Sequence, residues 1–162
     1  MTTPITIRPA QQGDLPKIFE LENEAFAPFG TAEPSEIISA RLKVFNEGFL
    51  VAICEQAVAG YASSEKWLVD RSGSLNQRPE NTHQNTGQIF YITALAVHKA
   101  QQGLGIGSML LRQLIEIAKQ HHCSHIKLET THAAEFYRRH GFNNISQTAK
   151  SDTTFSIMQL NL

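Results

Sequence analysis

A chain of 162 residues and 18.0 kDa is long enough for one domain with a single hydrophobic core. With 41% hydrophobic and 18% charged residues, it belongs to the globular class and not to the disordered one. A net charge of −1 argues against a general nucleic-acid-binding protein, and no apolar run approaches the roughly 20 residues of a membrane span. The first residues lack the apolar core of a secretory signal. Two cysteines, Cys54 and Cys123, cannot build a disulfide framework or a four-thiolate zinc site, so we expect two free core thiols in a cytoplasmic protein.

The charges are distributed unevenly along the chain. Residues 1–80 carry 11 acidic and 7 basic side chains, whereas residues 81–162 carry 4 acidic and 7 basic ones. A polyanionic ligand would therefore prefer the second half and a cationic ligand the first half. Solvated helix faces are the alternative explanation of such an asymmetry.

The first half of the chain has alternating and helical hydrophobic periodicity. Alternation of Ile5 and Ile7 with polar residues predicts a strand, and Asp14 two positions before Pro16 is typical of a helix N-cap. The helical stripe of apolar residues places Glu20, Glu22 and Glu24 mostly on the other face. The expected elements are a strand over Thr3–Arg8, a helix from Asp14 to about Phe26, a helix from Pro34 to Gly48, and a hairpin of strands Phe49–Glu55 and Ala57–Lys66.

Residues 67–87 lose all periodicity, and at this length we expect either a functional lid or a disordered insertion. Beyond them the expected elements are a strand over Gln88–Val97, a helix over Gly105–His121, a strand over His125–Thr130, a short helix over Ala133–His140, and a last strand over Thr153–Leu160, with room for a short strand near Phe142–Ser146. The resulting order, βααβββαβαβ, predicts a mixed α/β sheet with helices on both faces, built as one domain over residues 1–162.

The segment between the strand ending at Val97 and the next helix is rich in glycine. Gly103, Gly105 and Gly107 let the backbone approach a ligand, and their amides together with the helix N-terminus suit a phosphate, most readily a pyrophosphate. The Walker A sequence is absent, and the dinucleotide fingerprint would need glycine or alanine where Ser108 stands. A glycine-rich helix start without a ligand is the remaining alternative.

Three motifs in order resemble one family. The stretch from Gln102 to Gly107 resembles the Gln/Arg-x-x-Gly-x-Gly/Ala acyl-CoA signature of the GNAT superfamily of N-acetyltransferases. Leu95-Ala96-Val97 is similar to the strand whose backbone pairs with the pantetheine arm there. Phe136–Phe142 resembles the Tyr-x-x-x-Gly-Phe segment that closes the CoA site. The resemblance covers essentially the whole chain and implies the GNAT acyl-CoA N-acyltransferase fold.

This resemblance implies direct transfer of an acetyl group from acetyl-CoA, as co-substrate, to an amine. Tyr137 takes the place of the general acid that protonates the departing thiolate, although an aromatic side chain that merely packs is the alternative. Arg138, Arg139 and Lys99 become candidates for the adenosine phosphates. The implied acyl-CoA-binding residues are Leu95, Ala96, Val97, Gln102, Gly103, Leu104, Gly105, Ile106, Gly107, Ser108 and Tyr137.

The general base is less determined. Many relatives have a glutamate in the strand before the loop, but Tyr91–Ala94 contains no carboxylate. Glu129 is our candidate, and ribosomal-protein alanine acetyltransferases resemble this chain in a Leu-Glu pair at that strand. His83, His98 or a water chain are alternatives. The histidines and cysteine within residues 121–125 lack a second ligand cluster, so we expect no metal site.

The last prediction concerns the amine that accepts the acetyl group. Residues 22–28 and 39–52, with the insertion at 67–87, resemble the arylalkylamine (serotonin-type) N-acetyltransferases and their microbial relatives. The two histidines which that family uses as a proton relay correspond to Tyr91 and Thr93 here. We expect a small primary amine, arylalkylamine or polyamine-like, as acceptor; the alternatives are a protein N-terminus or lysine, or a non-catalytic acyl-CoA-binding module. The resemblance is also compatible with a homodimer. The acids that could attract a cationic amine are Glu20, Glu22, Glu24, Glu33 and Glu36.

Overall fold

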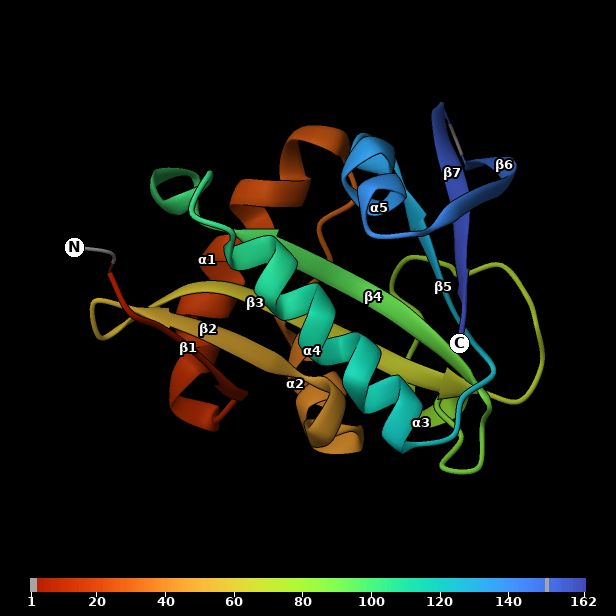
Figure 1. Ribbon diagram of the computed structural model, residues 1–162, viewed down its shortest axis with the longest axis horizontal. Helices are drawn as coiled ribbons and strands as arrows, with labels where there is room; N and C mark the ends of the chain where they lie inside the picture. The colour runs from red at the N-terminus through yellow and green to blue at the C-terminus, as the bar shows by residue number, and fades with distance from the viewer. Residues whose placement is uncertain (1–2, 151) are drawn as a thin grey trace.

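A computed structural model describes residues 3–150 and 152–162 (Figure 1). All strands form one seven-stranded sheet in the order β1-β2-β3-β4-β5-β7-β6. Neighbouring strands are antiparallel except β4 and β5, which are parallel, so the sheet is mixed. The strands are β1 (Ile5–Pro9), β2 (Leu50–Cys54), β3 (Ala57–Trp67), β4 (Ile89–Val97), β5 (His125–Thr130), β6 (Asn143–Lys150) and β7 (Thr153–Asn161).

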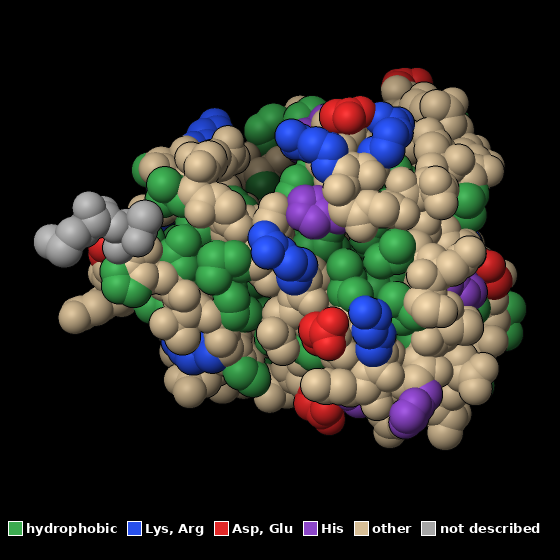
Figure 2. Space-filling model, viewed as in Figure 1, with side chains coloured by type: hydrophobic (Ala, Val, Ile, Leu, Met, Phe, Trp, Pro, Cys, Tyr) green, Lys and Arg blue, Asp and Glu red, His purple; other side chains and the backbone are tan. Residues whose placement is uncertain are grey.

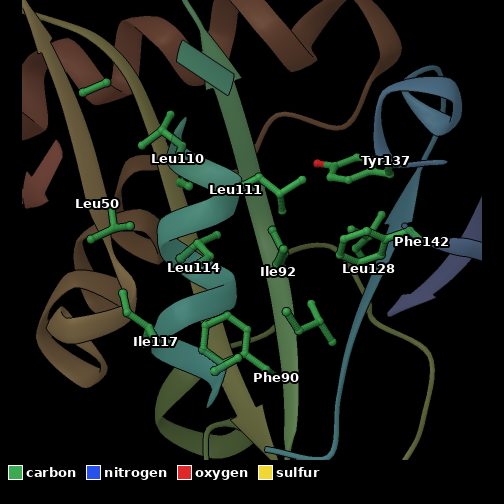
Figure 3. Close-up of a cluster of buried hydrophobic side chains, with 14 of the residues drawn as sticks. Leu50, Phe90, Ile92, Leu110, Leu111, Leu114, Ile117, Leu128, Tyr137 and Phe142 are labelled. Atoms are coloured by element: carbon green, nitrogen blue, oxygen red, sulfur yellow. The ribbon is translucent and has the colours of Figure 1, made fainter. Parts of the chain in front are cut away.

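Helices cover both faces of this sheet, as Figure 1 shows, and the predicted fold class is confirmed. The helix α4 lies on one face, where Leu110, Leu111 and Leu114 are fully buried (Figure 3). On the opposite face, α1 and α2 bury a second cluster that includes Ile18 and Leu21. The helices are α1 (Leu15–Phe26), α2 (Ser35–Val44), α3 (Pro79–Thr82), α4 (Ile106–Gln120) and α5 (Ala134–Arg139). None of the described helices has the length and apolar character that crossing a membrane requires.

Most of the expected elements are confirmed, with shifted ends. The hairpin turns at Glu55 and Gln56, whose positive φ angles of 52° and 65° suit a two-residue turn between twisted strands. The second helix ends at Val44, before a 3-10 turn that reaches Gly48. Trp67 is buried and completes β3, because its ring stacks on Tyr91 with centroids 4.0 Å apart; assigning it to the insertion was wrong. The extra strand exists but runs over Asn143–Lys150, longer than expected, along β7.

Asp14 is the N-cap residue of the first helix, as predicted, but its side chain makes no capping hydrogen bond to that helix. Its carboxylate binds the Arg8 guanidinium, with one contact of 2.7 Å, and accepts a hydrogen bond from the Gln11 amide at 2.8 Å. The charged guanidinium of Arg8 is a stronger hydrogen-bond donor than a free helix amide. The Asp14 side chain therefore binds Arg8 and the Gln11 amide, and in this way it closes the preceding 3-10 turn. The Arg8 partner holds the pKa of Asp14 below its ordinary value.

The parallel strands β4 and β5 separate after a short contact. Only Ile89–Tyr91 pairs with His125–Lys127, and the strands then diverge (Figure 1). A bulge in the β3–β4 ladder, between Ser63 and Ser64, leaves Thr93 without a register partner and turns β4 further away. The edge of β4 from residue 92 to 97 that faces β5 therefore has unpaired backbone groups inside the molecule, in the middle of the sheet.

Candidate functional site

The loop before α4 presents backbone amides in one direction. Gly103 and Gly105 have φ angles of 85° and 82°, which glycine adopts without strain, and Gly105 is the N-cap residue of α4. The backbone N–H groups of residues 103–108 have no hydrogen-bond acceptor among the described residues. Free amides at the start of a 15-residue helix attract a phosphate through hydrogen bonds and the helix dipole.

These amides border a cavity of about 590 Å³, the phosphate-side cavity. Figure 2 shows the surface hollowed between this loop and α5. The side chain of Ile106 is buried, so only its amide can reach a ligand, whereas Leu104 is 54% exposed. The residues that line the phosphate-side cavity are Leu95, Val97, Gln101, Gln102, Gly103, Gly105, Ile106, Gly107, Ser108, His132, Ala133, Glu135, Phe136 and Arg139.

The three predicted phosphate cations are placed differently. Arg139 lines the phosphate-side cavity, whereas Lys99 lines the neighbouring cavity between the strands. Arg138 forms an ion pair with Glu135 instead. Gln102 lines both cavities and donates from its amide to the Val97 carbonyl at 3.5 Å. The geometry therefore favours Arg139 among the cations.

A second cavity, of about 390 Å³, lies where β4 and β5 diverge; we call it the inter-strand cavity. Leu95, Ala96 and Val97 line it, and on this side their backbone groups are the unpaired edge of β4. An extended chain that carries amide groups can pair with such an edge as a further strand would. The cavity continues into the phosphate-side cavity through Leu95, Val97 and Gln102, so the two form one groove.

Tyr137 lines the inter-strand cavity from α5. Its ring packs edge-on against Phe142 at 5.6 Å, and Figure 3 shows its hydroxyl directed toward β4. The hydroxyl has no hydrogen-bond partner within residues 3–150 and 152–162. Burial raises the pKa of Tyr137, so its O–H group stays protonated at neutral pH and can donate a proton or a hydrogen bond into the cavity.

A third cavity, of about 90 Å³, lies beside the gap and shares Phe26 and Thr93 with the inter-strand cavity; we call it the small cavity. Residues 68–78, which we call the strap, cross it. The strap is held by Lys127 on Asp70 at 2.5 Å and by the Asn76 amide on Glu33 at 2.8 Å. The lining residues are Glu22, Phe26, Thr31, Glu33, Arg41, Gly73, Ser74, Leu75, Gln77, Tyr91, Thr93, Glu129, Lys150 and Phe155.

Glu129 is held firmly at one wall of the small cavity, with its side chain 5% exposed. Its Oε2 accepts hydrogen bonds from the Tyr91 hydroxyl at 2.8 Å, the Gly73 amide at 3.0 Å and the Lys150 ammonium at 3.0 Å. Its Oε1 is buried and has no partner in the described part of the chain. Burial and the neighbouring carboxylate raise the pKa of Tyr91. One carboxylate oxygen is therefore fixed by three donors, while the other is buried without a donor.

Glu22 forms another wall. Of the two explanations for the acids of this region, a solvated helix face and attraction of a cationic amine, the solvated face is wrong for Glu22, which is 3% exposed. It accepts hydrogen bonds from the Tyr61 hydroxyl and, at 2.8 Å, from the Glu33 amide, and these donors compensate part of the cost of its burial. Burial raises the pKa of Glu22. No cation contacts it within the described residues.

Two other acids form a buried cluster with Arg41. The Arg41 guanidinium binds Glu33 at 2.9 Å and Glu65 at 3.0 Å. Sequence reasoning missed Glu65, Arg41 and Lys150 as parts of the site. These residues come from distant elements, and nothing local in the sequence signals that their charges meet.

The remaining candidates lie elsewhere. His83 accepts a hydrogen bond from the Lys66 amide and stacks on Phe45, and it lines none of the three cavities. His98 accepts a hydrogen bond from the Ala100 amide at 3.0 Å and thereby caps a short turn. Within residues 3–150 and 152–162, no group of three or more histidine, cysteine or acidic side chains could hold a metal. Cys54 and Cys123 are free and buried.

Comparisons with known proteins can now be set beside this geometry. The model of the acetyltransferase (GNAT) family matches residues 15–142. No curated protein sequence matches the chain significantly. Three solved structures illustrate the likeness over nearly the whole chain. The loading GNATL domain of CurA from Lyngbya majuscula superposes with a TM-score of 0.86 at 13% identity, covering 98% of each chain.

The second is yncA from Salmonella typhimurium, solved with acetyl-CoA, with a TM-score of 0.72 at 24% identity over 97% of this chain and 93% of that one. The third is the ribosomal-protein-alanine N-acetyltransferase from Brucella melitensis, with a TM-score of 0.70 at 25% identity over 97% and 99%. The first two likenesses, below 25% identity, concern the fold alone.

Proposed function

The chain belongs to the acetyltransferase (GNAT) family, and from that premise we propose that its acceptor is the primary amine of a small molecule. As a member it is an acetyl-CoA-dependent N-acetyltransferase, so the proposal concerns the acceptor and the residues that act. One observation carries it: the small cavity beside the inter-strand gap holds about 90 Å³, and the strap lines one side of it. An open groove, as a peptide needs, would favour a protein acceptor instead.

The phosphate-side cavity and the inter-strand cavity form one groove, which we call the donor groove. It fits acetyl-CoA, which supplies the acetyl thioester when bound. We propose that the backbone of Leu95, Ala96 and Val97 pairs with the amide groups of the pantetheine arm, because this strand edge is unpaired. The amides of residues 103–108 bind the pyrophosphate, with Gln102 beside them. Gln102 offers neutral donors, so we assign most of the phosphate binding to the backbone. Arg139 is the nearest candidate for a further phosphate.

The acceptor amine must lose a proton to a general base before it reacts, since an alkyl amine with a pKa near 10.4 is protonated at neutral pH. Deprotonation across about three pH units costs roughly 4 kcal/mol. We assign the uptake of the first ammonium proton to Oε1 of Glu129, the buried oxygen without a donor, with Tyr91 and Lys150 fixing the other oxygen. As the N–C bond forms and the C–S bond breaks, the Tyr137 O–H donates a proton to the sulfur, and the second proton lost by the nitrogen restores the Tyr137 hydroxyl. The products are then the acetamide and the free thiol.

Two classes of small amine meet this description. Arylalkylamines are suggested by the resemblance of the N-terminal half, and the rings of Phe26, Tyr91 and Phe155 line the small cavity. Polyamine-like aliphatic amines are suggested by its carboxylates. A protein N-terminus is the second candidate, and the observation that favours it is the likeness to the Brucella melitensis enzyme.

The test is acetyl-CoA-dependent product formation across aryl-alkyl amines, polyamines, amino acids and short peptides. Mass spectrometry is preferable to thiol dyes, since Cys54 and Cys123 could react with them. We expect acetylated small amines with wild-type protein and far less product with the Tyr137→Phe variant. Product from peptides only would replace the proposal with a protein acceptor. Binding of acetyl-CoA without any product would leave a non-catalytic acyl-CoA-binding module.

A further inference from the structure

We infer that the acceptor is a short linear diamine whose second ammonium group binds Glu22 in the small cavity. This inference rests on the proposed function and names the class of its substrate. Three independent features of the cavity carry it: its volume, a buried carboxylate without a cation, and a buried carboxylate oxygen without a donor.

The volume separates aliphatic from aromatic amines. An apolar cavity of roughly 150 Å³ is known to accept benzene, whereas the small cavity holds about 90 Å³. Rings already occupy its walls, from Phe26, Tyr91 and Phe155. A linear alkyl chain is narrower than an aryl ring and needs less of the space between the strap and these side chains. The volume of the cavity therefore favours an aliphatic amine.

The charges show where a cation is missing. Two of the three lining carboxylates have a cationic partner: Glu33 binds Arg41 at 2.9 Å and Glu129 binds Lys150 at 3.0 Å. Glu22 is equally buried, yet both of its hydrogen-bond donors, the Tyr61 hydroxyl and the Glu33 amide, are neutral. A buried carboxylate is costly without an opposite charge. An ammonium group of the ligand supplies that charge, as Arg41 does for Glu33.

The third feature is the buried Oε1 of Glu129, on β5. It is buried and lacks a donor in the described part of the chain, although its residue lines the cavity. An amine N–H group satisfies it and is placed for proton transfer. Glu22 comes from α1 and Glu129 from the sheet, so the two carboxylates lie on different walls. A ligand that satisfies both carries one amine at each end of a short chain.

The chemistry keeps the two amines distinct. The ammonium group at Glu129 gives its first proton to Oε1, and the free amine forms the new N–C bond while the thioester C–S bond breaks. The sulfur receives a proton from Tyr137, and the second proton lost by the nitrogen restores the Tyr137 hydroxyl. The amine at Glu22 stays protonated throughout, because it faces a carboxylate and no acyl group. One acetylation therefore yields a monoacetylated diamine that keeps one positive charge.

The experiment compares kcat/KM for 1,4-diaminobutane, butylamine and 2-phenylethylamine at fixed, saturating acetyl-CoA. The first two share a chain length and differ in the second amine alone. We expect a preference for the diamine of roughly 10- to 100-fold, the scale of one charge-assisted hydrogen bond in a buried site. Diamines of two to six carbons then give the chain length that best spans the cavity.

Matched variants locate the second ammonium group. In Glu22→Gln the amide oxygen still accepts from Tyr61 and the Glu33 amide, but the charge is lost, so the ratio of diamine to butylamine should fall toward one. Glu20→Gln on the same helix is the control, because Glu20 pairs with Lys17 at the surface and should keep the wild-type ratio. Thermal unfolding and acetyl-CoA affinity, measured on both variants, verify that each is folded.

The outcomes separate this inference from the proposed function. A diamine preference that Glu22→Gln removes supports it. Equal turnover of butylamine or 2-phenylethylamine would overturn it while the proposed function stands. A preference that persists in Glu22→Gln would remove Glu22 from the ammonium site. Absence of product from every small amine would overturn the proposed function, and the diamine inference with it.

Discussion

The two halves of the site are built in different ways. About half of the residues that line the donor groove belong to one continuous stretch, which runs along β4, through the glycine loop and into α4, and we assign most donor binding to its backbone. The other lining residues come from α1, the turn after it, β5, α5 and the segment between β5 and α5. The small cavity is lined by residues that α1, the segment before α2, α2, the strap, β4, β5, β6 and β7 contribute separately. A backbone site binds what every acyl-CoA has in common. A side-chain site can differ between relatives of one fold, and this is where specificity resides.

The electrostatics of the two halves differ as well. The donor groove offers free amides and a helix dipole, which require no buried charge. The small cavity buries several carboxylates with fewer cations, and buried ion pairs are costly to assemble. Changes in the first half should therefore abolish binding of the donor, whereas changes in the second should alter the choice of acceptor.

The largest effect is expected for Gly105→Glu. This substitution places a side chain at φ 82° and a negative charge among the amides that we assign to the pyrophosphate. Loss of two or more charge-assisted hydrogen bonds should raise the Kd for acetyl-CoA by about 100-fold or more, measured by calorimetry. Gly30→Glu is the control, since Gly30 has φ 69° outside the donor groove. Unchanged affinity in Gly105→Glu would remove the loop from the donor site.

Tyr137→Phe should slow the acetyl transfer without weakening the binding of acetyl-CoA or of the amine. Because the hydroxyl has no partner in the described structure, its removal should leave the melting temperature and the acetyl-CoA Kd unchanged. We expect kcat to fall about 100-fold or more, the usual scale of general acid catalysis. Steady-state kinetics with a small amine measures this. A variant that turns over at the wild-type rate would end the assignment.

Gly73→Ala should perturb the acceptor half alone. A Cβ on Gly73 would overlap the Tyr91 hydroxyl and come within 2.8 Å of Glu129 Oε2, so the strap must move away. We expect a rise of about 10-fold in the KM for the amine, with an unchanged Kd for acetyl-CoA. Gly13→Ala is the control, because a Cβ there meets no atom within 4 Å. Equal kinetics in both variants would show that the strap does not bound the acceptor site.

The smallest effect concerns the pH dependence of stability. Burial raises the pKa of Glu22 above its value in the unfolded chain, so the native state retains this proton to a higher pH. Its contribution to stability is therefore complete at low pH and is lost as the pH rises through the folded value. In the Glu22→Gln variant this position does not titrate, so the variant does not lose this stability as the pH rises.

The melting temperature of Glu22→Gln, relative to wild type, should consequently rise by a few degrees between pH 5 and pH 9. Thermal unfolding at several pH values measures the difference, with Glu20→Gln as a flat reference. If the Glu22→Gln variant instead became relatively less stable at high pH, a cation would already compensate Glu22 in the wild-type protein.

The same contrast explains how far the sequence could be interpreted. The strand, glycine loop and helix from residue 89 to 120 are contiguous, so periodicity and glycine spacing predicted their order and the donor groove. The roles of Gln102, the loop amides and Tyr137 stay predictions, since no observation of a bound ligand tests them. What is local in the chain is thus visible in the sequence.

The small cavity could not be predicted in this way. Periodicity placed Glu22 on a solvated face, but a partner 39 positions away, Tyr61, lets it be buried. Lys150 reaches Glu129 only because β6 folds back along β7. Trp67 is buried because it stacks on Tyr91 across the β3–β4 ladder. Each of these contacts depends on tertiary pairing, for which a single sequence has no local signal.

The most direct test of this account is a competition in one reaction mixture. Wild-type protein, acetyl-CoA, 1,4-diaminobutane and a short peptide with a free N-terminus are incubated together, and all acetylated products are quantified by mass spectrometry. The account predicts that monoacetylated diamine dominates, because a cavity of about 90 Å³ suits a small amine better than a peptide. Acetylated peptide as the dominant product would contradict it.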